Sequence, residues 1–226
     1  MSNMYSTTSA RETAYQTIRN RIINLDLKPN DVLNEKLLLE EMGMSRTPIH
    51  EAIIMLSLEH LVVIRPQSST FVAPIDLKMV DVEQFSRYVM EKEVSQRACS
   101  LLREEHRQLY EENFQLYQIA SASQSGDRNS RMFELDNAFH RLAFAVCGMG
   151  EYYDWMQKAF QHIERIRILS LQIGIASYIQ EDHEQIVQCM FDGDAQRVGE
   201  LLDQHLTRYR SDLLPIRKQY PYYFKM

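Results

Sequence analysis

The sequence predicts a mainly α-helical protein made of two domains, with strands confined to one short stretch near the N-terminus. Apolar residues recur at helical spacing along most of the chain, and strand-like runs occur only between residues 61 and 72. The chain has 226 residues but only 7 Gly and 6 Pro, which excludes a loop-rich β-sandwich. The length suits two domains, and a hinge at residues 74–76 divides them into 1–75 and 76–226.

Three helices and a β-hairpin are expected in the first domain. The expected helices are 11–25, 35–42 and 45–59, and the expected strands are 61–64 and 70–72. Pro29 cannot continue the first helix, while Asn34 is a suitable N-cap for the second helix, which Gly43 ends. Ser45 is a suitable N-cap for the third helix, and Pro48 falls in its first turn, where a missing N–H costs little. This order is the outline of a winged helix-turn-helix.

The start of the third helix carries the residues best suited to contact DNA. In a helix-turn-helix, the first residues of the second helix of the motif meet base edges in the major groove. Arg46 has the planar fork of donors that pairs with guanine, while Ser45 and Thr47 offer hydroxyl and backbone N–H groups to phosphate. The alternative is that Ser45 only caps the helix and Arg46 is a solvated charge.

Only helices are expected in the second domain, because no alternating pattern follows the hinge. The expected helices are 77–102, 104–123, 129–147, 151–173, 177–191 and 194–213. Several of the breaks between them contain Gly, as at 125–127, 148–150, 174 and 192–194. Such a series predicts an all-α bundle. The aromatic segment 220–224 is expected to pack on a neighbouring part that the sequence does not identify.

Charge and cysteine content limit the class of protein. The net charge is −6, and residues 1–75 hold 7 basic and 8 acidic side chains, so DNA binding must rest on a few placed Arg and Lys residues. Cys99, Cys147 and Cys189 are isolated and lack metal-type spacing, which is typical of reduced thiols in the cytoplasm. Neither a secretory signal nor an apolar run of about 18 residues is present. We therefore expect a cytoplasmic protein.

Four residues of the second domain have spacings that suit a metal site. Asp136 and His140 lie four residues apart in a helical stretch, so both side chains face the same side. His183 lies 10 residues before Gly193 and His205 lies 12 after it, so an antiparallel hairpin brings these two level. One Asp and three His suit Zn, Ni, Fe or Mn rather than Ca or Mg. Each histidine alone is more often a polar core residue, and it is the joint geometry that predicts a metal site.

Residues 11–73 resemble the N-terminal domain of the GntR family of bacterial transcription regulators. The specific part of the match is Ser-Arg-Thr-Pro at 45–48 followed by Glu-Ala at 51–52, and further matching segments are 27–29, 35–38, 59–62 and 71–72. The resemblance implies a winged helix-turn-helix whose DNA-contacting residues are Lys36, Ser45, Arg46, Thr47 and His50.

The first domain departs from this family at several positions. His50 stands where the family usually has Arg, and Ser69 stands where it has the Gly of the wing tip. Leu25, Asn30 and His60 also replace glycines that are usual in the family. The operator sequences of relatives therefore do not carry over to this chain.

Residues 79–213 resemble the FCD effector-binding domain found in the FadR branch of the same family. Its metal signature is Asp-x3-His, a second His and a third His 22 residues on, present here as Asp136, His140, His183 and His205. Met149 is a departure, because an Asn is common there. The family has an Arg that faces the effector carboxylate, and Arg87 takes this position, four residues before Glu91. On sequence alone, Arg87 and Glu91 are typical of a surface salt bridge.

The predicted function is a ligand-responsive transcription regulator, a repressor by preference, that binds an inverted-repeat operator as a homodimer. Its expected effector is a small organic acid that lies between a divalent transition metal ion, Zn first, and Arg87. Two alternatives are a metalloenzyme acting on a small carboxylate and a pure metal sensor. The sequence has no H-E-x-x-H pair, Gly-rich phosphate loop or nucleophile elbow, so we expect no enzymatic activity.

Overall fold

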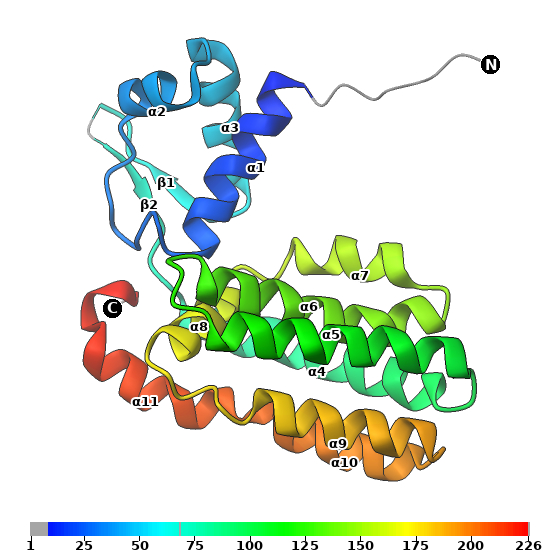
Figure 1. The fold of residues 1–226 in the computed structure, drawn as a ribbon. Coiled ribbons are helices and arrows are strands. Elements are labelled where there is room, and N and C mark those ends of the chain that lie inside the picture. Colours follow the sequence, from blue (N-terminus) through cyan, green and yellow to red (C-terminus); the bar gives the residue numbers. More distant parts are fainter. Residues whose placement is uncertain (1–8, 68, 226) are drawn as a thin grey trace, which may run out of the picture. The chain divides into compact units, whose positions relative to one another are not determined.

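The computed structural model describes residues 9–67 and 69–225, which form two compact units. One unit comprises the residues up to 75 together with those from 222 onward, and the other comprises Asp76–Pro221. The predicted fold class is confirmed, since both units are mainly helical and the described residues form a single two-stranded sheet (Figure 1). None of the described helices is long and apolar enough to cross a membrane.

The first unit has the three helices and the antiparallel hairpin of a winged helix-turn-helix. Its elements are α1 (Ala10–Ile23), α2 (Glu35–Met42), α3 (Arg46–Leu58), β1 (Val62–Ile64) and β2 (Thr70–Val72). Val63 is the register partner of Phe71 in the hairpin. Helices α1 and α3 pack together, with Ile18, Ile22 and Ile49 fully buried between the elements of this unit. Burial of such side chains contributes about 1.5–3 kcal/mol each.

Local signals explain most boundaries in the first unit. Asn34 Oδ1 accepts hydrogen bonds from the Lys36 and Leu37 N–H groups, so Asn34 is the N-cap of α2 that the sequence predicts. Gly43 ends α2 in the left-handed region, with φ +62°. Ser45 occupies the N-cap position of α3, but its side chain makes no capping hydrogen bond.

Three residues that replace family glycines keep a backbone conformation that favours glycine. Leu25, Asn30 and His60 have φ values of +64°, +72° and +61°. For Leu25 and His60 the left-handed conformation costs about 1–2 kcal/mol relative to glycine, whereas Asn tolerates it more easily. The turns of the fold are therefore kept although the residues that normally make them are absent.

The second unit is a bundle of helices. Its elements are α4 (Leu77–Ala98), α5 (Glu104–Ala122), α6 (Arg128–Val146), α7 (Gly150–Gln157), α8 (His162–Gln172), α9 (Ile179–Phe191), α10 (Ala195–Thr207) and α11 (Tyr209–Gln219). Helix α4 contacts α6, α8 and α10, while α5 lies along α6 (Figure 1). Helices α9 and α10 lie side by side and are joined at Gly193, where φ is +75°. None of the three cysteines forms a disulfide.

Two of the predicted helices are each divided in the structure. The stretch 151–173 forms α7 and α8, because the His162 and Ile163 N–H groups donate to the buried Glu83 carboxylate of α4, each at 2.8 Å. Glu83 thus satisfies the free N–H groups with which α8 begins, from a distant part of the chain. The stretch 194–213 forms α10 and α11, because the hydrogen bonding tightens at Arg208, whose N–H donates to the His205 carbonyl.

The predicted second domain extends to residue 226, but the structure places residues 222–225 with the first unit. The reason is main-chain pairing between this C-terminal segment and the end of the first unit. The Ile75 N–H donates to the Tyr223 carbonyl, and the Lys225 N–H donates to the Ile75 carbonyl, both at 2.8 Å. A short 3-10 helix, Pro221–Tyr223, leads into this pairing. The neighbour on which the aromatic end packs is therefore the winged-helix unit.

Candidate functional site

The structure brings together the four residues with metal-type spacing. Asp136 and His140 come from α6, His183 from α9 and His205 from α10, and one ligand atom of each lies within 4.8 Å of the others. His183 Nε2 lies 3.2 Å from His205 Nε2 and 3.3 Å from Asp136 Oδ1. His140 Nε2 lies 3.8 Å from the same Asp136 oxygen. All four side chains are buried.

Two of the four ligand atoms of this cluster lack the partners that buried polar atoms normally have. Asp136 Oδ1 and His140 Nε2 are buried and make no hydrogen bond with any residue that the structure describes. Such atoms are nearly always satisfied in native proteins. Separations of 3.2–3.8 Å match those between ligands that lie about 2 Å from a common ion. Three imidazoles and one carboxylate therefore fit a divalent transition ion such as Zn²⁺ in both chemistry and spacing.

Two carboxylates outside the cluster orient its imidazoles. Glu91 Oε2 lies 2.9 Å from His140 Nδ1, and Asp182 Oδ2 lies 3.1 Å from His205 Nδ1. A hydrogen bond at Nδ1 fixes the tautomer and leaves Nε2 free to bind a metal ion. The ring of His183 is stacked on Phe139, with centroids 3.6 Å apart. The three rings are thus held with their Nε2 atoms toward one point.

The electrostatics of the cluster favour the protonation states that bind metal. Burial is the main effect that lowers the pKa of His140 and His183, and repulsion from His205 lowers that of His183 further. Burial alone would raise the pKa of Asp136, but the Arg167 guanidinium and the His140 ring outweigh it, so this pKa lies well below its usual range. Neutral imidazoles and an ionised carboxylate are the forms that coordinate an ion.

Arg87 lies beside this cluster, and the structure corrects the surface salt bridge that its spacing from Glu91 suggests. Arg87 Nε donates to Glu91 Oε1 at 2.7 Å, and the two residues are only 4% and 1% exposed. Burial raises the pKa of Glu91, but Arg87 and His140 together lower it to about 2. Arg87 Nη2 is buried and has no hydrogen-bond partner among the residues that the structure describes. The Arg87 fork therefore keeps one donor free.

Arg167 is a functional candidate that the sequence analysis missed. It lies on α8, forms an ion pair with Asp136 Oδ2 and covers the ring of Phe133 at 4.7 Å. Its side chain is 12% exposed, so the guanidinium is largely desolvated. The local signal is an Arg between Ile166 and Ile168, which by itself does not distinguish a site residue from a surface residue.

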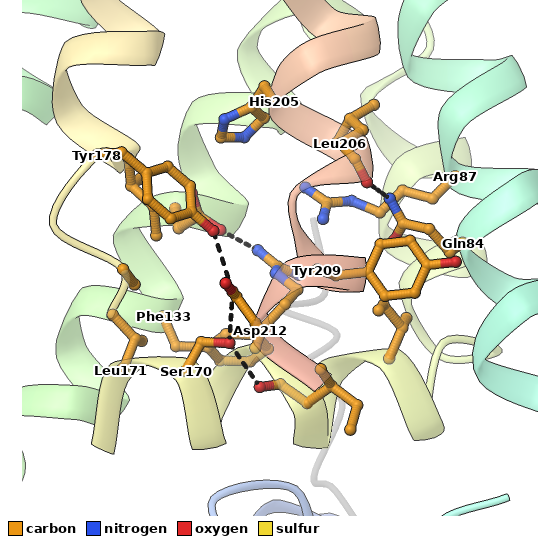
Figure 2. Close-up of a pocket in the computed structure, with 16 residues that line it drawn as sticks. Gln84, Arg87, Phe133, Ser170, Leu171, Tyr178, His205, Leu206, Tyr209 and Asp212 are labelled. Atoms are coloured by element: carbon orange, nitrogen blue, oxygen red, sulfur yellow. Dashed lines mark hydrogen bonds and ion pairs between the residues drawn. The ribbon is translucent and has the colours of Figure 1, made fainter. Parts of the chain in front are cut away.

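A pocket adjoins the cluster, and both Arg87 and Arg167 line it. Figure 2 shows Arg87 and His205 among the residues around this pocket. The cavity volume is about 50 Å³, which suits a few water molecules or a small carboxylate. The lining residues are Gln84, Arg87, Phe133, Asp136, Ile163, Ile166, Arg167, Ser170, Leu171, Ala176, Tyr178, Ile179, His205, Leu206, Tyr209 and Asp212.

The far wall of the pocket is a short hydrogen-bond chain (Figure 2). Asp212 Oδ2 accepts from Ser170 Oγ at 2.9 Å and from the Tyr178 hydroxyl at 3.1 Å. Burial raises the pKa of Asp212. Two guanidinium groups and two hydroxyl groups in one pocket suit a small polar acid that carries a carboxylate and further oxygens.

The five residues predicted to contact DNA lie on α2 and at the start of α3, and all of them are exposed: Lys36, Ser45, Arg46, Thr47 and His50. The side chain of Arg46 is 81% exposed, and its Nε lies 3.7 Å from Glu35 Oε2. His50 Nδ1 lies 3.3 Å from the other Glu35 oxygen. Glu35, which the sequence analysis did not single out, thus positions both basic groups.

Comparison with known proteins gives the same two-part division. The family model described as bacterial regulatory proteins of the gntR family matches residues 10–72, and the FCD domain model matches residues 84–208. The HTH-type transcriptional repressor RspR of Escherichia coli K12 is 26% identical over 214 residues, which cover 94% of this chain and 92% of that protein.

Two solved structures share the fold. Escherichia coli McbR/YncC matches with a TM-score of 0.73 at 17% identity, covering 94% of this chain and 99% of that one. A GntR transcriptional regulator from Rhodococcus sp. RHA1 matches with a TM-score of 0.75 at 16% identity, covering 91% of this chain and 98% of that one.

Proposed function

This chain belongs to the GntR family of bacterial DNA-binding transcription regulators and carries an FCD domain, and we propose that it represses transcription in response to a small organic acid. The FCD match covers residues 84–208, which is more than half of the chain. In this proposal the winged-helix unit binds the operator, and the helical unit binds a divalent metal ion together with the acid. The name of the relative RspR, a repressor, supports the direction of control.

The helical unit is proposed to hold one divalent transition ion, preferably Zn²⁺, on Asp136, His140, His183 and His205. When bound, such an ion supplies a Lewis-acidic centre with open positions for ligand oxygens. The unpartnered Asp136 Oδ1 and His140 Nε2 atoms support this assignment. The surrounding carboxylates of Glu91 and Asp182 hold the imidazoles in place.

The organic acid is proposed to lie between the metal ligands and Arg87. The free Nη2 of Arg87 donates to one anionic or polar group of the acid, and Arg167 provides a second guanidinium in the same pocket. The hydroxyl groups around Asp212 receive the remaining polar atoms. Small hydroxy acids, keto acids and sugar acids have this combination of groups.

The winged-helix unit is proposed to read an inverted repeat as part of a homodimer. Arg46 is exposed at the start of α3, where the helix N-terminus approaches base edges and phosphates. Helix α4 supports dimer formation, because Val82, Phe85 and Val89 expose 58%, 67% and 43% of their surface along one side. Sedimentation of the Phe85→Asp variant tests this, and a dimer as stable as the wild type would place the interface elsewhere.

The observation that carries the proposal is that buried polar atoms without a hydrogen-bond partner among the described residues occur both in the metal cluster and in the adjoining pocket. Asp136 Oδ1 and His140 Nε2 belong to the cluster, and Arg87, whose Nη2 lacks a partner, lines the pocket. Leaving each of these atoms unsatisfied costs about 1–3 kcal/mol. A metal ion and an acid bound together satisfy all three.

The test is calorimetric titration of hydroxy, keto and sugar acids into wild type and Arg87→Lys, each loaded with Zn²⁺ or treated with chelator. Lysine keeps a cation beside Glu91 but lacks the free fork donor, so we expect affinity to fall about 10–100-fold. Arg97→Lys on the same helix is the control, since Arg97 is exposed and pairs only with Glu93 among the described contacts. Equal acid affinities with Zn²⁺ and with chelator, and in wild type and Arg87→Lys, would refute the proposal.

We propose further that the protein carries out no catalysis. The relative RspR and the Rhodococcus structure with the same fold are both named as transcription regulators, which favours an effector site over a metalloenzyme site. The free guanidinium donor favours an organic effector over a pure metal sensor. Incubation of small carboxylates with the Zn²⁺-loaded protein tests the first point, and measurable turnover would contradict it.

A further inference from the structure

The chain passes between its two units twice, and the ends of both passages meet within the first unit. The first passage follows Ile75, and the second follows Pro221, where the chain returns from α11. The Ile75 N–H donates to the Tyr223 carbonyl and the Lys225 N–H donates to the Ile75 carbonyl, both at 2.8 Å. Backbone hydrogen bonds therefore join the C-terminal residues to Ile75, the residue from which the first passage starts.

Side chains strengthen the docking of the C-terminal segment, residues 221–225. Phe224 forms a parallel β-bridge with Ile75, and the two residues are 8% and 0% exposed. Asn30 Nδ2 donates to the Tyr222 carbonyl at 2.6 Å. The Tyr222 side chain, in contrast, is 85% exposed and adds little buried surface. The docking therefore depends on the backbone pairing, on Phe224 and on Asn30.

Helix α11 links the C-terminal segment to the candidate metal centre. Asp182 joins the two, because its carboxylate contacts His205 Nδ1 at 3.1 Å and Arg208 Nη2, directly before α11, at 2.9 Å. Further along α11, Asp212 forms part of the pocket wall and Ile216 is fully buried. A change at His205 or in the pocket thus acts on the helix that leads into the C-terminal segment.

The first passage is tied to the same pocket through a different helix. The Asp76 N–H, directly after Ile75, donates to His162 Nδ1 at 3.0 Å. His162 is the first residue of α8, which supplies Arg167 and Ser170 to the pocket. Both passages are therefore anchored in helices that line the pocket, α8 for the first and α11 for the second.

We propose that the C-terminal segment is a second tether through which occupancy of the metal centre and pocket acts on the winged-helix unit. This inference rests on the proposed function, because it assumes that an ion and an acid bind in the helical unit. With one passage alone, a single hinge would connect the winged-helix unit to the helical unit. Occupancy of the metal centre and pocket would then have little means of favouring one arrangement of the two units over another. The second passage closes a loop through α11, so that ordering of α11 restricts the residues around Ile75.

The test is hydrogen exchange, followed by mass spectrometry, with Zn²⁺ alone as the probe. The full chain is compared with a variant that ends at Tyr220 and with Asn30→Gly, each with and without Zn²⁺. Glycine suits the φ of +72° at position 30, so Asn30→Gly removes the bond to Tyr222 without adding strain. Tyr222→Ala is the matched control, because it changes an exposed side chain and leaves the backbone pairing intact.

In the full chain and in Tyr222→Ala, we expect Zn²⁺ to slow exchange in the β1–β2 hairpin by about fivefold or more, a usual size for coupling between sites. In the variant that ends at Tyr220, Zn²⁺ should slow exchange in α9 and α10 as before but change that of the hairpin by less than about twofold. Asn30→Gly should fall between these two results.

Two results would overturn the tether. One is an equal effect of Zn²⁺ on the hairpin with and without residues 221–226. The other is protection of α9 and α10 in the full chain with no effect on the hairpin. If Zn²⁺ protects neither α9 and α10 nor the hairpin, the metal site is refuted, and so is the tether that depends on it. This result is distinguishable from the two results that refute the tether alone.

Discussion

Replacement of Glu91 by Gln separates the metal-orienting role of this carboxylate from its structural role. Glu91 is 1% exposed and contacts both His140 Nδ1 at 2.9 Å and Arg87 Nε at 2.7 Å. Gln has the same shape but no charge. Its amide can donate to His140 Nδ1, which would move the ring proton to Nε2, the atom that faces the other metal ligands. The variant therefore weakens metal binding without removing a ligand.

The size of both effects follows from these contacts. Loss of an outer carboxylate that orients a histidine ligand costs about 10–100-fold in metal affinity, or about 1.4–2.7 kcal/mol. Without metal, the same change leaves the Arg87 guanidinium buried without its counter-charge. Removal of one partner of a buried ion pair costs about 3–5 kcal/mol of folding stability. The metal-free Glu91→Gln protein should therefore be much less stable than wild type.

Two further variants serve as matched comparisons. Asp182→Asn also removes a carboxylate from an imidazole, that of His205, but its charged partner Arg208 has a side chain 40% exposed. It should weaken metal binding to a similar degree and cost less than about 1 kcal/mol of stability. Glu93→Gln, on the same helix as Glu91, breaks only an exposed pair with Arg97 and should change neither quantity.

The assays are competition with a chromophoric Zn²⁺ chelator for affinity and urea unfolding of the metal-free protein for stability. Zn²⁺ affinity of Glu91→Gln within about twofold of wild type would refute the orienting role of Glu91. Equal urea midpoints for Glu91→Gln and Asp182→Asn would refute the argument from burial, since only the first variant leaves a fully buried cation unpaired.

Three further predictions concern DNA, the pocket and pH. Arg46→Ala should lose about 1–3 kcal/mol of affinity for DNA selected from a random pool, measured by fluorescence anisotropy, and unchanged affinity would remove Arg46 from base recognition. Arg167→Met should bind small carboxylates about 10–100-fold more weakly by calorimetry, because one of the two guanidinium groups of the pocket is gone; unchanged carboxylate affinity would contradict this. Burial raises the pKa of Glu83 to about 7, so wild type should lose about 2–3 kcal/mol of stability as the pH rises from about 4.5 through 7. Urea unfolding of Glu83→Gln should lack this loss, and a matching loss would show that another group causes it.

The parts of the fold that sequence could predict are those with local causes. Asn34 and Gly43 fix the two ends of α2 through their own capping geometry, and the predicted range of this helix is that of the structure. The residues of the metal cluster could also be predicted from the sequence. Asp136 and His140 share one helix face, and the turn at Gly193 sets the other two histidines level, so two short-range spacings predict two pairs of ligands. Contact between the two pairs was an assumption that the spacings do not fix, and the structure brings the pairs together.

The parts that sequence could not predict depend on distant residues. The spacing of Arg87 and Glu91 is the same for a surface pair and a buried pair, and only packing of α4 against α6, α8 and α10 decides that it is buried. The break before α8 arises from Glu83, and the neighbour of the C-terminal segment is Ile75, both far away in the chain. Arg167 gains its role from an ion pair with another helix. Periodicity carries no information on such contacts.

The most direct test of the account is the affinity of the protein for its selected DNA site under three conditions. Fluorescence anisotropy should be measured with chelator, with Zn²⁺, and with Zn²⁺ plus the tightest-binding acid from the calorimetric series. We expect the acid to weaken DNA binding by about fivefold or more in the presence of Zn²⁺ and to have no effect in its absence. Equal affinity in all three conditions would contradict the claim that the helical unit controls DNA binding.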